Sequence, residues 1–167
     1  MFARKGPLPV DDISKSAFLN RPDLHLGTEG EFAGWYRWKR DAFETHTGPF
    51  WHRMEDDGTI RSAFRVEKKH LNSAGNVHGG CFMSFADYSL FAVACPVMGG
   101  SGVTVAFSCE FIDAAREGEL VESLVEITRA GGSLIFLRGV LKSAERTLLT
   151  FSSTIKRVKR KPSTSKA

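Results

Sequence analysis

The hydrophobic pattern of the chain is dominated by one apolar run, from Cys81 to Val97. A few polar residues and one late proline interrupt it: Ser84, Asp87, Tyr88, Ser89 and Pro96. Because the run follows two glycines and ends near Pro96 and the pair Gly99–Gly100, it predicts a single long helix. A helix that is apolar on nearly every face has to be covered on nearly every face, so we expect it inside the fold.

Strand patterns stand on both sides of this helix. The segments Phe50–Met54 and Thr59–Glu67 flank the turn-rich group Glu55–Gly58 and predict a hairpin. After the helix the apolar residues recur with a period of two, which predicts four more strands, at residues 103–111, 120–129, 134–142 and 148–158. This order predicts an α+β fold in which an antiparallel sheet wraps around one long central helix.

We divide the chain into three parts. Residues 1–45 form an N-terminal extension that prolines interrupt, with short helices expected near residues 12–19 and 34–46. Residues 46–158 form one domain, since a chain of 167 residues suits a single core and no internal repeat stands out. Residues 159–167 form a basic flexible tail.

Composition and charge narrow the class of protein. Hydrophobic residues make up 42% and charged residues 25%, which argues for a globular chain. The last twelve residues carry six of the 23 basic residues and no acid, so 17 basic residues face 19 acidic ones in the rest of the chain. Since the excess positive charge belongs to the tail, we expect no nucleic-acid partner, although weak contact of the tail with nucleic acid or acidic lipid stays an alternative.

Cysteines, histidines and the apolar run point to a cytoplasmic protein without a cofactor. Cys81, Cys95 and Cys109 lack CxxC spacing and have apolar neighbours, which predicts reduced, buried thiols. The N-terminus has no apolar segment of the kind that marks a secretory signal. The histidines lack metal-ligand spacing, so no metal is expected. The run from Cys81 to Val97 is too short and carries an acid at its centre, so we expect no membrane partner.

The acid at the centre of the apolar run needs an explanation. An aspartate is rarely buried without a partner, and an unpaired carboxylate in apolar surroundings costs several kcal/mol or takes up a proton. One interpretation is a structural acid that is bonded to Ser84, to Ser89 or to a neighbouring subunit. The other is a catalytic carboxylate, because perturbed acids cluster at active sites.

The residues around Asp87 form a recognisable pattern. Asn72 is followed by His78-Gly79-Gly80 and then by Asp87, nine positions after the histidine. This set, at the start of an apolar helix, resembles the signature of the PaaI-type phenylacetyl-CoA thioesterases, a branch of the hotdog-fold acyl-CoA thioesterases. The resemblance extends over about residues 50–156. It leaves out most of the extension and the tail, and the segment after the helix is slightly short for the family.

The resemblance implies a hotdog fold and a cofactor-independent enzyme that hydrolyses an acyl-CoA thioester to free acid and CoA. Backbone N–H groups of Gly79 and Gly80 would polarise the thioester carbonyl, since a helix N-terminus has free donors and partial positive charge. Asp87 would act as general base or as nucleophile. Asn72 would orient water or substrate, and Thr104 matches a hydroxyl that assists the water in some members.

Four further residues are assigned to substrate binding. The family uses the histidine that His78 matches mainly to shape the loop by side-chain hydrogen bonds. Phe82 is available to contact a medium-length or aromatic acyl group, although the core needs it too. Lys156 and Arg157, at the start of the basic segment, would approach the phosphates of coenzyme A.

Two other functions and the assembly state also follow from the sequence. A non-catalytic acyl-CoA-binding hotdog module and a hotdog enoyl-thioester hydratase both stay open. Gly80 and Asp87 are seven residues apart, which is roughly 10 Å along a helix. One helix can therefore hardly supply both the N–H groups that polarise the carbonyl and the carboxylate base. Two symmetry-related helices can, so we expect a homodimer or a dimer of dimers.

Overall fold

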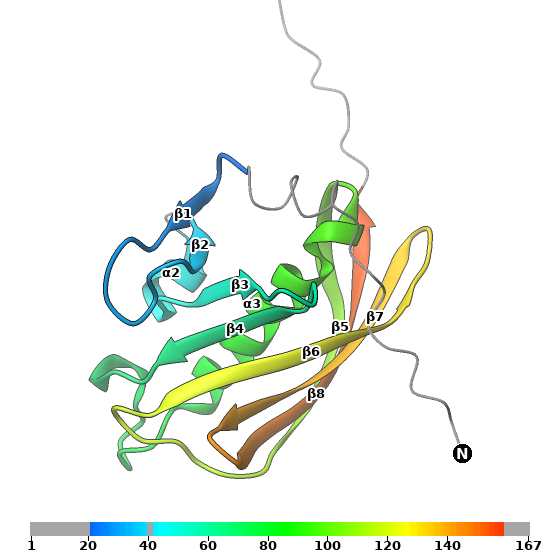
Figure 1. Cartoon of the computed structure of the whole chain (residues 1–167). Coiled ribbons are helices and arrows are strands. Elements are labelled where there is room, and N and C mark those ends of the chain that lie inside the picture. The colour runs from blue at the N-terminus through cyan, green and yellow to red at the C-terminus, as the bar shows by residue number, and fades with distance from the viewer. Residues whose placement is uncertain (1–20, 40–41, 159–167) are drawn as a thin grey trace, which may run out of the picture.

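The fold is one curved sheet around one long helix, and Figure 1 shows it as a computed structural model. The structure describes residues 21–39 and 42–158. The helix expected near residues 12–19 and the basic tail of residues 159–167 lie outside the described residues.

Within residues 21–39 and 42–158, eight strands form a single antiparallel sheet in the order β1-β2-β3-β4-β6-β7-β8-β5. Their bounds are Leu24–Leu26 (β1), Tyr36–Trp38 (β2), Trp51–Met54 (β3), Ile60–Arg65 (β4), Ser101–Phe111 (β5), Leu120–Ala130 (β6), Leu134–Ser143 (β7) and Arg146–Val158 (β8). The helices are α2 (Phe43–Thr47), the 3-10 helix η1 (Lys68–His70) and α3 (Gly79–Met98). The predicted β3–β4 hairpin, the long helix and the four later strands are therefore confirmed.

Helix α3 lies in the hollow of the sheet, as Figure 1 shows. Its Phe85 side chain is fully buried and packs against Phe50, which precedes β3, and Phe64 of β4, with ring centroids 5.2 and 4.8 Å away. The helix is long and apolar enough to cross a membrane by composition, but more than half of its apolar window is buried inside the domain. Its hydropathy is accounted for by its place in the core.

The C-terminal end of α3 comes slightly later than Pro96. Gly99 adopts a left-handed conformation with φ of 65°, which glycine tolerates without a steric penalty and which ends the helix. The guanidinium of Arg157 donates to the carbonyl oxygen of Met98 at 3.0 Å. A cation at this position satisfies one of the free carbonyls and complements the negative end of the helix dipole.

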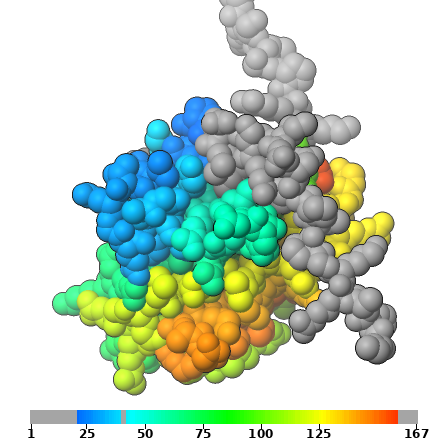
Figure 2. Space-filling model, viewed as in Figure 1, coloured from blue at the N-terminus to red at the C-terminus, as the bar shows by residue number. Residues whose placement is uncertain are grey.

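The prediction of a helix over residues 34–46 is wrong for the first half of this segment. Tyr36–Trp38 is strand β2, which pairs with β1 on one side and with His52 of β3 on the other. Only Phe43–Thr47 is helical. Pairing in the sheet overrode the near-helical spacing of the tryptophans. Figure 2 shows this N-terminal segment (blue) lying directly against the residues of the β3–β4 hairpin (cyan to green).

Strand β5 contains a bulge that changes which of its residues face the core. Its register with β8 shifts between Thr104 and Ala106, so Val105 is the extra residue. Val105 is 52% exposed, whereas Phe107 and Cys109 pack against the core. β5 lies at the edge of the sheet, where Val103 and Val105 are exposed, while the Thr104 hydroxyl reaches Asp87 of α3.

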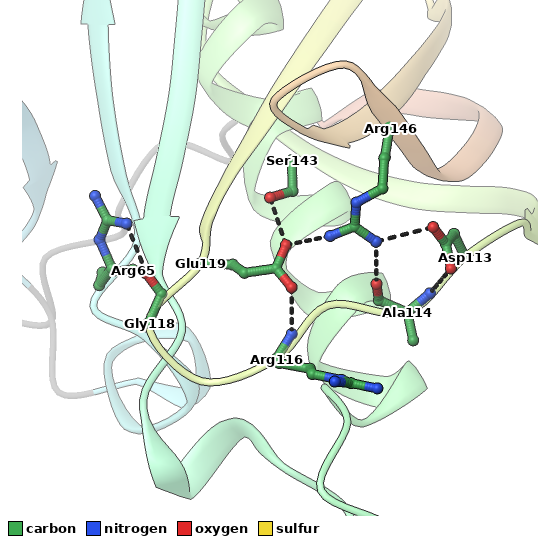
Figure 3. A network of polar contacts seen from close by, with 8 residues as sticks. All are labelled: Arg65, Asp113, Ala114, Arg116, Gly118, Glu119, Ser143 and Arg146. Carbon is green, nitrogen blue, oxygen red and sulfur yellow. Dashed lines mark hydrogen bonds and ion pairs between the residues drawn. The ribbon is translucent and has the colours of Figure 1, made fainter.

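A polar network fixes the loop between β5 and β6, as Figure 3 shows. Arg146 donates to Asp113 and to the carbonyl of Ala114, and it pairs with Glu119, which also accepts a hydrogen bond from Ser143. The backbone N–H of residue 114 and the Arg146 guanidinium lower the pKa of Asp113, and the Ser143 hydroxyl lowers the pKa of Glu119.

This loop supports the segment that leads into α3. The backbone N–H of Val77 donates to the carbonyl oxygen of Ala115 at 2.8 Å. Ala115 is fully buried, so the loop cannot move without disturbing the core. The network at the end of the sheet therefore positions the helix N-terminus, where His78, Gly79 and Gly80 lie.

Candidate active site

A trough with a volume of about 650 Å³ runs along one face of α3. Its floor consists of helix residues that recur every three or four positions: Ser84, Asp87, Tyr88, Phe91, Cys95 and Met98. This spacing places their side chains on one stripe of the helix. The predicted acid therefore lies in the wall of a cavity and not in the sealed part of the core.

The two side walls of the trough come from opposite ends of the sheet. One wall is the start of β5 with the turn before it, including Gly102 and Phe107. The other is the N-terminal segment, which contributes Arg21, Asp23, Trp38, Phe43 and Glu44. Aromatic rings and methionines supply the apolar part of the lining, and charged side chains and serines supply the polar part, a combination that suits a small-molecule site.

Asp87 is held by Thr104, which donates from its hydroxyl to the carboxylate oxygen Oδ1 at 2.7 Å. The predicted partners of Asp87 bond to the helix backbone instead. Ser84 donates to the carbonyl of Gly80, and Ser89 donates to the carbonyl of Ala86. Burial raises the pKa of Asp87, the Thr104 hydrogen bond lowers it, and the nearby charge of Glu44 raises it further. Thr104 pairs with the buried Ile155 of β8, so its side chain lies on the face of the sheet that is turned toward α3.

Substituting Thr104 with Val should move the acidic limb of the pH profile of kcat to higher pH. Without the Thr104 hydrogen bond, the pKa of Asp87 rises above its already raised folded-state value. Because only the ionised carboxylate can act as base or nucleophile, kcat measured on the acidic limb, at a pH below both pKa values, should fall about tenfold, as the loss of a hydrogen bond to a charged group predicts. The pH profile of kcat measures the shift, and an unchanged limb would show that Thr104 does not tune Asp87.

The start of α3 differs from the expected pair of free donors. The N–H of Gly80 donates to Nδ1 of His78 at 2.9 Å, so the His78 side chain caps the helix. The N–H groups of Cys81 and Phe82 donate to the carbonyl of His78. Within the described residues, the N–H of Gly79 makes no hydrogen bond. The loop-shaping role implied for His78 matches this geometry, and Gly79 is the donor that is free to meet a carbonyl.

The remaining assigned residues lie away from the trough. Asn72 is exposed, and its side-chain oxygen accepts from the N–H groups of Ala74 and Asn76 within its own loop. Phe82 is 2% exposed and belongs to the core. Neither residue lines the trough. Their assignment to water or substrate stays a prediction, and the contacts that they make in this chain are structural.

Lys156 and Arg157 lie at the far end of α3 from the glycines. Arg157 caps the C-terminus of the helix through Met98, and Lys156 pairs with Val103 across the sheet. The helix spans 20 residues, so its two ends are roughly 30 Å apart. Contact of these two residues with coenzyme A phosphates stays a prediction.

Two residues at the trough, His52 and Tyr88, were not predicted from the sequence to belong to the site. His52 of β3 is fully buried, and its Nδ1 lies 2.6 Å from the hydroxyl oxygen of Tyr88. Burial lowers the pKa of His52 to about 3 and raises the pKa of Tyr88 well above its usual value, so both are neutral at physiological pH. They are 36 residues apart, and no local pattern connects them. Their pairing fixes the Tyr88 ring in the trough floor.

The described part of the chain holds no group of three or more His, Cys, Asp or Glu side chains placed to bind a metal ion. The trough offers a half-buried carboxylate and a hydroxyl that hydrogen-bonds it, and the N-terminus of α3 lies outside its lining.

The family model of the thioesterase superfamily matches residues 74–150. A putative esterase of Pseudomonas aeruginosa is 31% identical over 112 residues, which cover 63% of this chain and 80% of the relative. Human acyl-coenzyme A thioesterase 13 is 29% identical over 80 residues, which cover 47% of this chain and 57% of the relative.

Solved structures share the fold. A hypothetical thioesterase of Streptococcus pneumoniae, crystallised with coenzyme A, has a TM-score of 0.61 at 20% identity and covers 67% of this chain and 88% of its own. PaaI of Escherichia coli, from the phenylacetic acid degradation operon, has a TM-score of 0.63 at 20% identity, with coverages of 71% and 86%. Fold and trough define a hotdog-type domain. The chain belongs to the thioesterase superfamily, and the predicted family resemblance is confirmed.

Proposed function

We propose that the protein is an acyl-CoA thioesterase that hydrolyses a CoA thioester to free acid and CoA. The observation that carries this proposal is Asp87, which is half-buried in a trough with several aromatic side chains and hydrogen-bonded by Thr104. Burial raises the proton affinity of a carboxylate, which suits a general base. Apolar walls suit an acyl chain. The acyl-CoA thioesterase name of the human relative and the coenzyme A bound to the Streptococcus protein support the same substrate.

The geometry supports two courses for the carboxylate. As general base, Asp87 takes a proton from a water that attacks the carbonyl carbon. As nucleophile, it attacks the carbonyl directly and forms an anhydride that water then hydrolyses. In both courses a helix N-terminus stabilises the negative charge that develops on the carbonyl oxygen, and the thiolate of CoA leaves.

A hydrolysis screen tests the proposal. Wild-type protein is mixed with butanoyl-, octanoyl-, palmitoyl- and phenylacetyl-CoA, and free thiol is followed with a thiol reagent. Release of CoA with at least one substrate is expected. Tight binding of the same thioesters without release would favour the acyl-CoA-binding module, and hydration of crotonyl-CoA without release would favour the hydratase.

The active unit is proposed to be a homodimer or a dimer of dimers. Asp87 faces Thr104 of its own chain, while Gly79 lies about two helical turns away along the same helix. A partner's helix N-terminus can reach Asp87 where its own cannot. The exposed edge of β5, with Val103, Val105 and Phe111 at 47%, 52% and 54% exposure, offers an apolar surface for a second copy.

Light scattering at the concentration used for the assay tests this assembly. A mass of at least two chains is expected, and specific activity should fall when dilution separates the copies. A monomeric mass together with full activity would contradict the shared site. The cytoplasmic location, and the expectation that neither nucleic acid nor membrane is a partner, stay predictions.

A further inference from the structure

The trough along α3 is crossed at one place by a side chain from the N-terminal segment. Nη1 of Arg21 lies 2.9 Å from Sγ of Cys95 on the helix. Both residues line the trough. Arg21 therefore spans the trough from its N-terminal wall to its helical floor.

Several contacts hold the guanidinium of Arg21 in this position. Its Nε and Nη2 donate to the two carboxylate oxygens of Asp23 at 2.9 and 2.8 Å, in a bidentate pair. Its central carbon lies 4.9 Å from the ring centroid of Trp38. A fork-shaped guanidinium that is fixed by two parallel hydrogen bonds and by an indole face has little freedom to swing aside. Arg21 is thus a rigid part of the wall.

The distance between Asp87 and Arg21 limits the length of the acyl chain that fits between them. Cys95 follows Asp87 by eight residues, which corresponds to roughly 12 Å along the helix. The floor between them is provided by Tyr88 and Phe91. An acyl group whose carbonyl lies at Asp87 and whose chain follows the helix therefore meets Arg21 after a medium-length chain.

The charges that line the trough select against an anionic chain end. The positive charge of Arg21 is offset by Asp23, and the carboxylates of Glu44 and Asp87 lie on the same walls. Among the described residues, three carboxylates and one guanidinium line the trough, so a carboxylate at the end of the acyl chain would meet an excess of negative charge. Like charges at this range repel, and more strongly where water is partly excluded.

We propose that Arg21, where it crosses the trough to Cys95, blocks the acyl chain and thereby limits the substrate to neutral acyl groups of medium length. This inference rests on the proposed thioesterase function and names its substrate class. Arg21 acts as a specificity-determining residue, and it takes no part in the chemistry at Asp87.

The test compares acyl chain lengths in wild-type protein and in Arg21→Ala. Wild type should hydrolyse octanoyl-CoA with a higher kcat/KM than palmitoyl-CoA. Each further methylene that an opened trough buries is worth about fourfold in binding. The ratio of kcat/KM for palmitoyl-CoA to that for octanoyl-CoA should therefore rise at least about tenfold in Arg21→Ala, with little change for butanoyl-CoA, which does not reach the barrier.

Arg53→Ala is the matched control. Arg53 also pairs with a carboxylate two residues along the chain, Glu55, and its guanidinium also lies over an indole, that of Trp35, at 4.6 Å from the ring centroid. It does not line the trough. Its removal should leave the chain-length profile of wild type unchanged.

Cys95→Phe tests the same place in the opposite direction and does not depend on how Arg21→Ala folds. A larger side chain at Cys95 brings the barrier closer to Asp87, so activity with octanoyl-CoA should fall relative to butanoyl-CoA by at least about tenfold. In wild type, octanoyl-CoA should also be preferred over suberoyl-CoA, the chain of equal length that ends in a carboxylate.

The outcomes separate the inference from the function on which it rests. If wild type hydrolyses acyl-CoA but neither variant changes the chain-length profile, Arg21 does not block the acyl chain and the thioesterase proposal still stands. Preference for suberoyl-CoA would also overturn the inference. If wild type releases no thiol from any of these thioesters, the proposed function fails and the inference fails with it.

Discussion

Asp87→Asn is expected to reduce kcat for acyl-CoA hydrolysis by about 10²- to 10⁴-fold, the usual cost of losing a positioned base. Asparagine keeps the shape of the side chain and can still accept the Thr104 hydrogen bond, but it neither takes a proton from water nor attacks a carbonyl. Binding of a non-hydrolysable octyl-CoA thioether should therefore change little. Steady-state thiol release and calorimetric titration measure the two effects separately.

The same variant distinguishes a catalytic acid from a structural one. Because burial raises the folded-state pKa of Asp87, its ionised form opposes folding at neutral pH, and its protonated form stabilises the fold only at lower pH. Asn removes that charge, so the free energy of unfolding at neutral pH should stay the same or increase. Asp56→Asn, in the exposed turn of the β3–β4 hairpin, is the matched control and should leave activity unchanged. Unfolding of Asp87→Asn would show that the acid is structural.

Phe85→Ala is expected to lower the free energy of unfolding by about 3–5 kcal/mol, the typical cost of truncating a buried phenylalanine. Phe85 is fully buried at the centre of the core and packs against Phe50 and Phe64. Its removal leaves a cavity that the rigid sheet around α3 cannot readily close. Urea unfolding followed by tryptophan fluorescence measures the change.

Met83→Ala on the same helix is the control for Phe85. Met83 is 42% exposed, and alanine is at least as good a helix former, so the free energy of unfolding should change by less than about 1 kcal/mol. Equal destabilisation by both substitutions would mean that the face of α3 that bears Phe85 is not the one that anchors it in the core.

Periodicity predicted most of the sheet and the helix because each of those segments carries its own burial pattern. The apolar run of α3 and the alternating apolar residues of β6, β7 and β8 can each be recognised within the segment itself. The N-terminal segment does not follow this pattern. Trp35 and Trp38 have the spacing of a helical face, but Tyr36–Trp38 pairs with β1 and Tyr36 pairs with β3, and this pairing decides the structure of the segment. Such pairing depends on partners that no local window contains.

The candidate site was predictable only where residues are near one another in the chain or match a known pattern. Asp87 stands out as an acid in an apolar run, and Thr104 was placed by resemblance. The capping of Gly80 by His78 depends on a side-chain rotamer, and sequence leaves both glycine N–H groups equivalent. The walls that Arg21 and Glu44 supply come from a segment without a recognisable signature, and only the folded sheet brings them to α3.

The pH dependence of single-turnover hydrolysis tests the central claim most directly. Octanoyl-CoA is mixed with excess protein, wild type or Asp87→Asn, over the pH range in which the fold is stable, and thiol release is recorded. The account predicts that the wild-type rate rises with the ionisation of one group whose pKa lies above the usual range of an aspartate. It also predicts that Asp87→Asn lacks this limb and has only a small residual rate. The same acidic limb and a comparable rate in Asp87→Asn would contradict it.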